Sequence, residues 1–328
     1  MRPRIFVTRQ LPGDPLAQVR DRYEIDVWPE EGAPPYEMLL RKAAESDGLL
    51  VMLTDRIDAP LLGAAPRLRA VSTMAVGYDN IDVEAATTQG VAVCHTPGIL
   101  TETTADLAFA LLLAAARRVG EGERMLRAGR WRGWAPTQLL GRDVHGATLG
   151  IVGMGAIGQA VARRALGFGM SILYTSRSEH PRVERELGAR RLPLDAVLAA
   201  SDFVSLHVAL TPETRGLIGE RELARMQRHA VLINTARGPV VDQRALYAAL
   251  REGRIAAAGL DVFETEPLPA DDPLLALENV VLLPHIGSAS VATRTAMARI
   301  AVENLIAALE GREPANCLNW QHLVRESR

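Results

Sequence analysis

The sequence predicts an α/β protein with two domains, each built on a parallel sheet. Strand-like and helix-like segments alternate through the first hundred residues and again from Gly146 to Leu283. Such alternation at short spacing is typical of βαβ units, whose strands form parallel sheets. A glycine-rich turn between a strand and a helix, starting at Gly153, indicates that the second region is of the doubly wound kind.

Short apolar runs in the first hundred residues predict strands, and the amphipathic segments between them predict helices. The expected strands are Arg4–Thr8, Glu24–Trp28, Gly48–Leu53, Leu68–Met74 and Val91–Cys94. The expected helices are Asp14–Arg22, Glu37–Ala44, Ala59–Ala64 and Asp82–Gln89. These segments form the first α/β domain.

Pro97-Gly98 interrupts this pattern, and Thr101–Ala128 follows as one long predicted helix with acidic residues early and arginines late. The next segment, Gly129–His145, is a loop rich in helix breakers that carries Trp131 and Trp134. Tryptophan is enriched at protein interfaces, so this loop is a candidate interface. The alternative is that both rings pin the loop to its own domain.

The glycine-rich turn carries the functional interpretation. Thr148–Val152 is an apolar strand, and three glycines follow it at G-x-G-x-x-G spacing before a helix that starts at Ala156. Gly153 permits the tight turn, Gly155 allows a pyrophosphate to approach the backbone, and Gly158 lets the helix pack on the strand. N–H groups of the first helical turn then face the phosphates. We predict a dinucleotide site; the alternative is a plain strand–turn–helix.

The next predicted strand, Met170–Thr175, indicates which dinucleotide binds. About 20 residues past the glycines, an NAD site usually places Asp or Glu against the ribose 2′-hydroxyl. This chain has Ser176-Arg177-Ser178 instead. No carboxylate repels a 2′-phosphate, Arg177 can pair with one, and both serines can donate to it. We predict a preference for NADP(H), with NAD(H) possible; the alternative is that Arg177 is a solvated loop arginine.

The remaining segments continue the alternation. The expected strands are Phe203–His207, Ala230–Asn234, Ala256–Asp261 and Val280–Leu283. The expected helices are Val183–Leu187, Pro193–Ala200, Glu220–Arg225, Gln243–Glu252 and Ser290–Glu310. In a doubly wound sheet ligands bind beyond the carboxyl ends of the strands, so residues that follow these strands are candidates for chemistry.

Three such strand ends carry Arg237, Glu266 and His285. Histidine is the natural proton donor near neutral pH, and a carboxylate beside its other ring nitrogen favours the charged ring and orients it. An arginine offers a planar fork to a substrate carboxylate. Each residue alone is more often structural or solvated. Together with the dinucleotide turn, they predict reduction of a 2-keto acid by hydride transfer, with His285 as general acid/base.

The motifs GMGAIG, TARG, DVFETEP and PHIG, in that order, resemble those of the D-isomer-specific 2-hydroxyacid dehydrogenases. The similarity covers nearly the whole chain, and Ala75–Asp82 resembles the substrate loop of that family. The resemblance implies the same three catalytic residues, and backbone N–H contacts to substrate from Val76 and Gly77. The TSRS strand end and the WRGW loop make the chain most similar to the glyoxylate/hydroxypyruvate reductases within the family.

The resemblance also implies the domain order. A Rossmann dinucleotide-binding domain, residues 100–285, is inserted into a flavodoxin-like substrate-binding domain made of residues 1–99 and 286–328. The two long helices are then hinges, and closure would exclude water from hydride transfer. Because the family is typically dimeric through its cofactor domains, we expect a homodimer in which Trp134 reaches the partner's site and contacts substrate.

The cofactor contacts that we expect lie on the glycine-rich turn, the second strand end and the later strand ends. They are Thr104, Gly153, Met154, Gly155, Ala156, Ile157, Gly158, Ser176, Arg177, Ser178, His207, Thr235, Ala236, Arg237, Asp261, His285 and Gly287. Two roles are open for Asp261: it holds the nicotinamide carboxamide, as the family implies, or it caps the local turn. His207 lies where the family often lines the cofactor cleft, although Ala209 replaces the family's frequent proline. The remaining histidines show no partner pattern, and we expect them to be structural or on the surface: His95, His145, His180, His229 and His322.

Composition argues against several further classes of function. The 328 residues are 48% apolar with a formal net charge of −2, which favours neither a nucleic-acid nor a membrane-surface partner. The two cysteines, Cys94 and Cys317, form no CxxC pair or Cys/His cluster, so we predict no metal. The first ten residues lack the apolar core of a signal peptide, and the longest apolar run, Leu107–Ala116, is too short to span a bilayer. We expect a cytoplasmic protein.

Rival functions mostly share the fold. A 3-phosphoglycerate dehydrogenase would usually prefer NAD, would need a basic phosphate pocket and often has an extra C-terminal domain. A formate dehydrogenase of the family would have glutamine in place of Glu266. A phosphite-oxidising enzyme of the same fold and a non-catalytic, cofactor-sensing interaction protein also compete with the reductase interpretation. Glyoxylate and hydroxypyruvate are the substrates that we expect.

Overall fold

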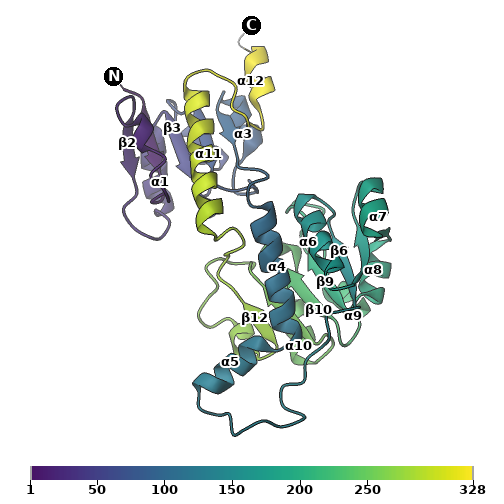
Figure 1. Ribbon diagram of the computed structural model, residues 1–328. Helices are drawn as coiled ribbons and strands as arrows, with labels where there is room; N and C mark the ends of the chain where they lie inside the picture. The colour runs from purple at the N-terminus through teal and green to yellow at the C-terminus, as the bar shows by residue number, and fades with distance from the viewer. Residues whose placement is uncertain (1, 327–328) are drawn as a thin grey trace. The chain divides into compact units, whose positions relative to one another are not determined.

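The computed structural model describes residues 2–326 (Figure 1). The chain forms two compact units. One unit takes the chain up to Leu100 and again from Ser288, and the other is the continuous stretch Thr101–Gly287. The sequence placed the crossings after residues 99 and 285, and the assignment of substrate to one unit and cofactor to the other stays a prediction.

The discontinuous unit contains a parallel sheet of five strands in the order β2–β1–β3–β4–β5. This is the flavodoxin-like strand order that the sequence predicts. Both faces of β3 and β4 are buried, as expected for a parallel sheet with helices on both sides. The strands are β1 (Arg4–Val7), β2 (Glu24–Val27), β3 (Gly48–Val51), β4 (Ala70–Thr73) and β5 (Ala92–Cys94).

Helices cover both faces of this sheet. One face is packed by α1 (Tyr36–Glu45), α2 (Ala59–Gly63) and α3 (Val83–Thr88). The other face is packed by α11 (Val291–Leu309), which lies against β3 and β4 (Figure 1). A short final helix that the sequence did not predict, α12 (Trp320–Glu326), begins with Trp320 packed on the same cluster as α11.

The expected helix Asp14–Arg22 is wrong in extent. Only a single 3₁₀ turn, Ala17–Val19, forms there. Gly13 and Asp14 both have positive φ, and a proline follows them, so the backbone cannot enter a helix before that turn.

The continuous unit contains a parallel sheet of seven strands in the order β12–β11–β10–β9–β6–β7–β8. The run from β8 to β11 is the strand order of a Rossmann dinucleotide-binding domain, so the predicted fold class is confirmed. Its strands are β6 (Thr148–Val152), β7 (Ser171–Thr175), β8 (Arg190–Arg191), β9 (Phe203–Leu206), β10 (Val231–Asn234), β11 (Ala257–Leu260) and β12 (Val280–Leu282).

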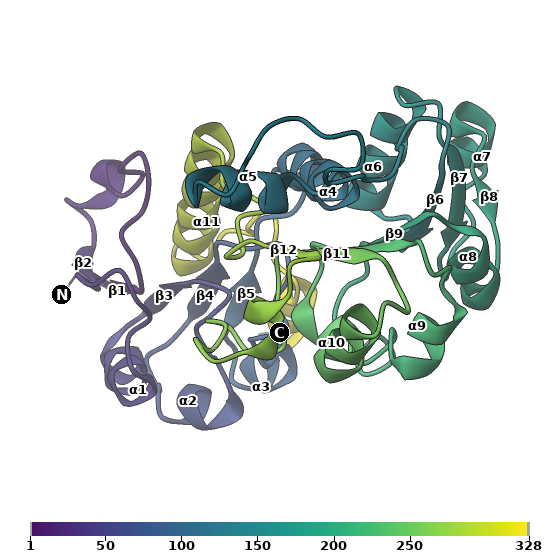
Figure 2. The ribbon, with the colours of Figure 1, turned by 90° about the horizontal axis from the view of Figure 1, so that it is seen from below.

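Helices lie on both sides of this sheet (Figure 2), and an apolar cluster fills the space on each face. Along β10, Val231 and Ile233 belong to one cluster and Leu232 to the other, because successive strand residues point to opposite faces. The first cluster is formed with α4 (Thr101–Ala116), α6 (Ala156–Leu166) and α7 (Pro181–Leu187). The second is formed with α8 (Leu194–Ala200), α9 (Glu220–Arg225) and α10 (Gln243–Arg251).

The expected helix Thr101–Ala128 is wrong at its centre, because two helices form there. After α4 ends, Arg118 has a left-handed backbone with φ 53°, and α5 (Val119–Arg127) begins in a new direction. Gly120 and Gly122 weaken helix formation just beyond this point by about 1 kcal/mol each. An ion pair of 2.6 Å between Arg118 and Glu121 holds the corner.

No helix within residues 2–326 has both the length and the apolar character needed to cross a membrane.

Candidate active site

The strand order of the continuous unit reverses between β6 and β9, and the loops after these strands lie side by side. The His207 N–H donates to the Val152 carbonyl at 2.7 Å. Gly153 has φ 98°, and a Cβ placed there would lie 2.6 Å from the His207 carbonyl oxygen, so only glycine fits. In doubly wound sheets, ligands bind at such a reversal.

The other two glycines of the turn differ in their surroundings. A Cβ on Gly158 would lie 2.2 Å from the Gly153 carbonyl oxygen, so α6 packs on the turn only because this residue is glycine. A Cβ on Gly155 would meet nothing within 4 Å, so the space beside it is open. Gly155 is also the N-terminal cap of α6, with no side chain accepting from the first-turn N–H groups. An open cradle in front of these N–H groups fits a pyrophosphate.

The residues between these glycines differ in which of their atoms a bound ligand can reach. The Met154 side chain is buried in the core, so only its backbone can contact a ligand there. Ala156 is exposed and Ile157 is half-buried. Their cofactor contacts stay predictions.

Ser176-Arg177-Ser178 follow β7 at the same edge of the sheet. Arg177 and Ser178 are exposed, while Ser176 is half-buried. Arg191 of β8 donates to the Ser176 carbonyl at 3.0 Å and to the Arg177 carbonyl at 3.1 Å, so a second arginine fixes the loop. The sequence analysis missed Arg191 because β8 is too short to give a strand pattern.

His285 and Glu266 meet beyond the last strands of the sheet. His285 Nδ1 lies 2.6 Å from Glu266 Oε2, and the Phe263 N–H donates to Glu266 Oε1 at 2.9 Å. Because the carboxylate accepts at Nδ1, the remaining nitrogen Nε2 is left for a ligand, and it has no hydrogen-bond partner among residues 2–326.

The electrostatics of this pair favour an ionised Glu266. Burial opposes its ionisation, but the hydrogen bond and charge of His285, the Phe263 N–H and the charge of Arg237 outweigh burial. The pKa of the Glu266 carboxyl therefore lies below its ordinary value, and the group is a carboxylate at neutral pH.

The loop that carries Arg237 is fixed by two residues whose roles the sequence analysis missed. The buried Asn234 side chain accepts from the Ala236 N–H at 3.0 Å and donates to the Arg237 carbonyl at 2.9 Å. A Cβ on Gly238 would lie 1.8 Å from the Phe263 carbonyl, so this glycine lets the loop press against the segment that leads to Glu266. The only sequence signal was that Asn and Gly bracket the TAR triplet.

Thr235, in the same loop, offers a further test of whether a cofactor fits. Its side-chain hydroxyl is buried and has no hydrogen-bond partner among the described residues. A buried hydroxyl without a partner is costly, so a bound ligand there would satisfy it. The cofactor contacts expected of Thr235 and Ala236 stay predictions, and the unpartnered hydroxyl of Thr235 is consistent with such a contact.

Asp261 holds the turn that presents His285. Its two carboxylate oxygens accept from the Ile286 and Gly287 N–H groups, both at 2.7 Å. Burial raises the pKa of Asp261 above its ordinary value even though these donors oppose the rise. His285 has a left-handed backbone with φ 54°, which costs a non-glycine residue about 1–2 kcal/mol. The two hydrogen bonds to Asp261 hold the two residues that follow His285 in the chain. Of the two roles left open for Asp261, the structure shows the turn-capping one.

Thr104, expected near the nicotinamide, lies in the first turn of α4. Its hydroxyl donates to the Gly287 carbonyl at 3.2 Å, and its side chain is buried. Thr104 therefore supports the same turn as Asp261, and its cofactor contact and that of Gly287 stay predictions.

His207 is a second histidine at this edge, and its surroundings differ. Its Nε2 lies 2.8 Å from Ser205 Oγ, and no carboxylate contacts the ring among the described residues. Burial of the ring lowers the pKa of His207 to about 4. This ring is neutral at neutral pH, and the cofactor contact expected of His207 stays a prediction.

Val76 and Gly77 follow β4 in the discontinuous unit, where both are half-buried. His95 Nδ1 lies 2.9 Å from the Val76 carbonyl oxygen, so the ring donates and fixes this loop. The Tyr78 ring packs edge-on against His95, with centroids 5.6 Å apart. The sequence pattern indicated no partner for His95, and the structure corrects that; the substrate contacts of Val76 and Gly77 stay predictions.

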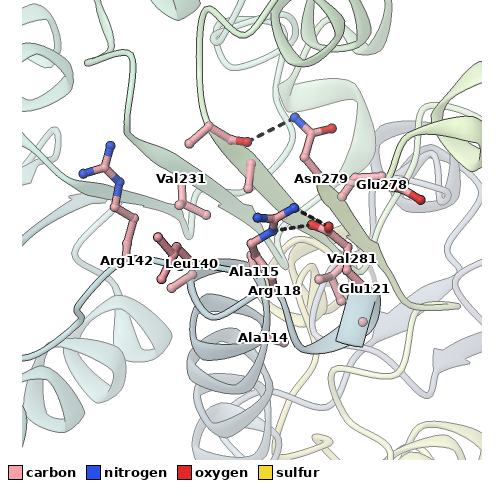
Figure 3. Close-up of a pocket in the computed structure, with 16 residues that line it drawn as sticks. Ala114, Ala115, Arg118, Glu121, Leu140, Arg142, Val231, Glu278, Asn279 and Val281 are labelled. Carbon is pink, nitrogen blue, oxygen red and sulfur yellow. Dashed lines mark hydrogen bonds and ion pairs between the residues drawn. The ribbon is translucent and has the colours of Figure 1, made fainter. Parts of the chain in front are cut away.

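A cavity of about 280 Å³ lies at the opposite edge of the seven-stranded sheet (Figure 3). It is bounded by the first residues of β10–β12, by the end of α4 and by the Arg118–Glu121 ion pair. Because His285 and the glycine-rich turn follow the carboxyl ends of the strands, this cavity is not part of the dinucleotide site. Leu140 and Arg142 of the following loop close one side of it.

The two tryptophans of the loop 129–145 are exposed. Trp131 is 53% exposed and Trp134 is 83% exposed. The alternative that both rings pin the loop to its own unit is therefore wrong for this chain. The substrate contact expected of Trp134 stays a prediction.

Known proteins place the chain in a family. A model of the NAD-binding domain of the D-isomer specific 2-hydroxyacid dehydrogenases matches residues 109–287. The glyoxylate reductase of Korarchaeum cryptofilum is 57% identical over 322 residues, which span 98% of this chain and 97% of that protein. The chain belongs to the D-isomer specific 2-hydroxyacid dehydrogenase family. As the sequence predicted, it is an NAD(P)-dependent dehydrogenase of the glyoxylate reductase type.

Two solved structures support the same family and its cofactor. A dehydrogenase chain 37% identical, the NADPH-dependent glyoxylate/hydroxypyruvate reductase of Sinorhizobium meliloti with NADP and malonate, matches with a TM-score of 0.85 over 97% of each chain. D-Lactate dehydrogenase from Aquifex aeolicus, complexed with NAD and lactic acid, is 29% identical and matches with a TM-score of 0.83 over 96% of this chain and 99% of that chain. This dehydrogenase therefore uses a nicotinamide dinucleotide.

No group of three or more His, Cys, Asp and Glu residues within residues 2–326 could hold a metal ion.

Substitutions of Gly158 and Gly155 should affect different properties: the first should lower the stability of the protein, and the second should weaken cofactor binding. Gly158→Ala places a methyl group against the Gly153 carbonyl and should lower the free energy of unfolding by about 1–3 kcal/mol. In Gly155→Ala the new methyl group points into open space, and alanine accepts the backbone conformation of this residue. The melting temperature of this variant should therefore match that of the unmodified protein. Its NADPH dissociation constant should rise about tenfold, because the methyl group occupies the space of the pyrophosphate.

Thermal unfolding and calorimetric NADPH titration check this pair. The fit of a pyrophosphate to this turn is contradicted if Gly155→Ala binds NADPH as tightly as the unmodified enzyme does.

Proposed function

We propose that this dehydrogenase uses NADPH to reduce glyoxylate and hydroxypyruvate to the corresponding D-2-hydroxy acids. The observation that carries the proposal is the His285–Glu266 pair next to Arg237, at the edge of the sheet where the glycine-rich turn also lies. The identity of 57% to a named glyoxylate reductase supports the choice of substrate.

The cofactor would be held by the first-turn N–H groups of α6 and by the Ser176-Arg177-Ser178 loop. When bound, the nicotinamide supplies a hydride to the carbonyl carbon of the substrate. Arg237 binds the substrate carboxylate with its planar guanidinium and orients the carbonyl. Val76 and Gly77 are proposed as backbone donors to the same carboxylate.

His285 supplies the proton. The ionised Glu266 accepts from Nδ1, so the protonated ring donates from Nε2 to the carbonyl oxygen as negative charge develops there. The neutral ring then regains a proton from solvent, which the nearby carboxylate favours. In oxidation of a hydroxy acid, the same ring accepts the proton.

Replacing His285 should stop turnover without preventing cofactor binding. Asn is the better replacement, because it tolerates the left-handed backbone at this position. The unmodified enzyme should oxidise NADPH with glyoxylate and with hydroxypyruvate. His285→Asn should lower kcat roughly 10²–10⁴-fold, since it removes the proton donor, while the NADPH dissociation constant changes less than about threefold.

Two further variants sharpen this measurement. Glu266→Gln keeps a hydrogen-bond acceptor beside Nδ1 but removes the charge, so it should lower kcat by less than His285→Asn does. The exposed His145 serves as a control, and His145→Asn should leave the rate unchanged. Saturable NADPH binding without turnover of glyoxylate, hydroxypyruvate or pyruvate would instead favour a non-catalytic, cofactor-sensing protein.

We propose that NADPH is preferred over NADH because of the loop after β7. Ser176, Arg177 and Ser178 include no carboxylate that would repel a 2′-phosphate, and the carboxylate that follows them, Glu179, pairs with Arg191 at 3.2 Å. Arg191 also fixes the backbone of the loop, at 3.0 and 3.1 Å. Arg177 and Ser178 are exposed there and are available to a phosphate. The Sinorhizobium meliloti relative, named as NADPH-dependent, supports this choice, whereas the Aquifex aeolicus relative was solved with NAD.

Arg177→Ala should therefore weaken NADPH more than NADH. Loss of a charged hydrogen-bond donor to the 2′-phosphate predicts a rise of roughly 10–100-fold in KM for NADPH. KM for NADH should stay within about threefold, because NADH lacks that phosphate. The exposed Arg185 of α7 provides the control variant Arg185→Ala. Equal kcat/KM for both cofactors in the unmodified enzyme would overturn the proposal.

We further propose a homodimer that forms through α5 and the following loop, residues 119–142, here called the arm. Half of the exposed large apolar side chains in the described chain lie on the arm. They are Val119, Leu126, Trp131, Trp134 and Leu140, with exposed fractions between 53% and 83%. So dense a group of exposed apolar side chains, with two tryptophans, is typical of an interface. We also propose that Trp134 of one copy contacts substrate bound by the other.

Replacing the tryptophans should weaken the dimer. The double variant Trp131→Ala/Trp134→Ala removes two aromatic anchors, so the dimer dissociation constant should rise roughly 30-fold or more in sedimentation or light-scattering measurements. Val291→Ala, at an exposed apolar residue of α11 in the discontinuous unit, is the control. If Trp134→Ala leaves the mass, the KM for glyoxylate and the substrate preference unchanged, its proposed role is wrong.

A further inference from the structure

Cys94 and Cys317 lie opposite each other although the sequence separates them widely. Cys94 ends β5, the edge strand of the five-stranded sheet, and Cys317 precedes α12. The two residues form an antiparallel bridge. Hydrogen bonds flank them on both sides, from the His95 N–H to the Asn316 carbonyl at 3.1 Å and from the Leu318 N–H to the Val93 carbonyl at 2.8 Å.

This hydrogen-bond pattern fixes the geometry of the cysteine pair. The bonds join the neighbours of Cys94 and Cys317 and not the two cysteines themselves, so this is a non-hydrogen-bonded antiparallel pair. In such pairs the Cα atoms lie about 4.5 Å apart and the side chains share one face. That spacing falls within the range of about 4.4–6.8 Å seen in disulfides. Both residues are free thiols here.

A buried asparagine joins the two segments, and the Cys317 S–H also donates to its Oδ1 at 3.4 Å. Asn319 is 2% exposed, and its Oδ1 accepts from the Val93 N–H at 2.9 Å. Its Nδ2 donates to Thr87 Oγ1 at 2.8 Å and to the Val91 carbonyl at 2.9 Å. Because Asn319 fixes the alignment of Cys317 with Cys94, a covalent bond between them requires no rearrangement of the backbone.

The two thiols have different surroundings. Cys94 is fully buried, whereas Cys317 is partly exposed. The Cys94 S–H and the N–H groups of Asn319 and Trp320 lower the pKa of Cys317 to about 7, while the same contact and burial raise the pKa of Cys94. Cys317 is therefore the accessible thiol with more thiolate at neutral pH, and the thiolate is the reactive form.

We propose that Cys94 and Cys317 are a redox pair, in which a peroxide oxidises Cys317 and Cys94 then closes an intrachain disulfide. In the first step the Cys317 sulfur attacks one oxygen of hydrogen peroxide, the O–O bond breaks, and hydroxide leaves and takes up a proton to become water. In the second step the Cys94 sulfur attacks the sulfenic sulfur, and the S–O bond breaks as water leaves. The thiols lose two electrons and two protons, and the peroxide becomes two water molecules.

The disulfide would act on a segment close to the predicted substrate loop. Cys94 directly precedes His95, whose ring contacts the Val76 carbonyl. His95 is held by the Asn316 carbonyl and by Asn304, which donates to the His95 carbonyl at 3.0 Å. A bond from Cys94 to Cys317 would fix this backbone covalently and would close a loop that includes the whole continuous unit.

Treatment of the full-length protein with a small excess of hydrogen peroxide tests the proposal. Intact mass should fall by two hydrogen atoms, and peptide mapping without reductant should show the peptides of Cys94 and Cys317 linked within one chain. A dithiol reductant should restore the mass. The oxidised protein should melt roughly 5–10 °C higher, because closing so long a loop restricts the unfolded chain.

Single-cysteine variants establish the order of the two steps. Cys94→Ala should stop at a sulfenic acid on Cys317 that a cyclic 1,3-diketone traps, and Cys317→Ser should leave Cys94 unmodified. Two free thiols after peroxide treatment of the unmodified protein would overturn the proposal, and this test does not depend on the folding of either variant. Oxidation of Cys94 in Cys317→Ser, or a disulfide between two chains, would overturn it as well. None of these measurements uses dehydrogenase activity, so failure of the proposed function would leave them interpretable.

Discussion

The hydrogen bond between His285 and Glu266 is the contact on which the carboxyl edge of the seven-stranded sheet depends. It is 2.6 Å long, and residues that directly follow β11 fix both partners. Asp261, at the end of β11, holds the turn after His285, and the Phe263 N–H fixes the Glu266 carboxylate. Gly238 lets the arginine loop press against Phe263, so three neighbouring strand ends support one another. The position of each reactive group is therefore set by its neighbours as well as by its own strand.

Burial and charge, more than residue type, distinguish the two histidines at this edge. His207 and His285 both follow strands of the same sheet. Burial without a carboxylate partner lowers the pKa of His207 to about 4, so that ring stays neutral. His285 instead contacts the Glu266 carboxylate, whose own pKa is lowered. The chemistry predicted for His285 thus depends on Glu266, nineteen residues away in the sequence.

The sequence predicted the parts of the fold and the site that local patterns encode. Alternation of strands and helices indicated both sheets, and the glycine spacing indicated the turn before α6. Residues that act through distant partners were missed, since nothing near Arg191 or Cys317 in the sequence indicates the Ser176 loop or Cys94. The helix break at Arg118 was missed for another reason. Helical periodicity continued through it, and only the left-handed backbone and two following glycines redirect the chain.

The two edges of the seven-stranded sheet differ in the kind of side chain that they present. The carboxyl edge carries charged and polar groups held by hydrogen bonds of 2.6–3.0 Å, and displacement of any one would leave a buried partner unsatisfied. Near the amino edge lie a cavity of about 280 Å³ and the arm, with its exposed apolar side chains. Apolar contacts are non-directional and tolerate changes of shape better than a hydrogen-bonded constellation does. Substitutions in the arm therefore leave the hydrogen bonds of the carboxyl edge intact, whereas substitutions of Asn234, Gly238 or Asp261 disturb them.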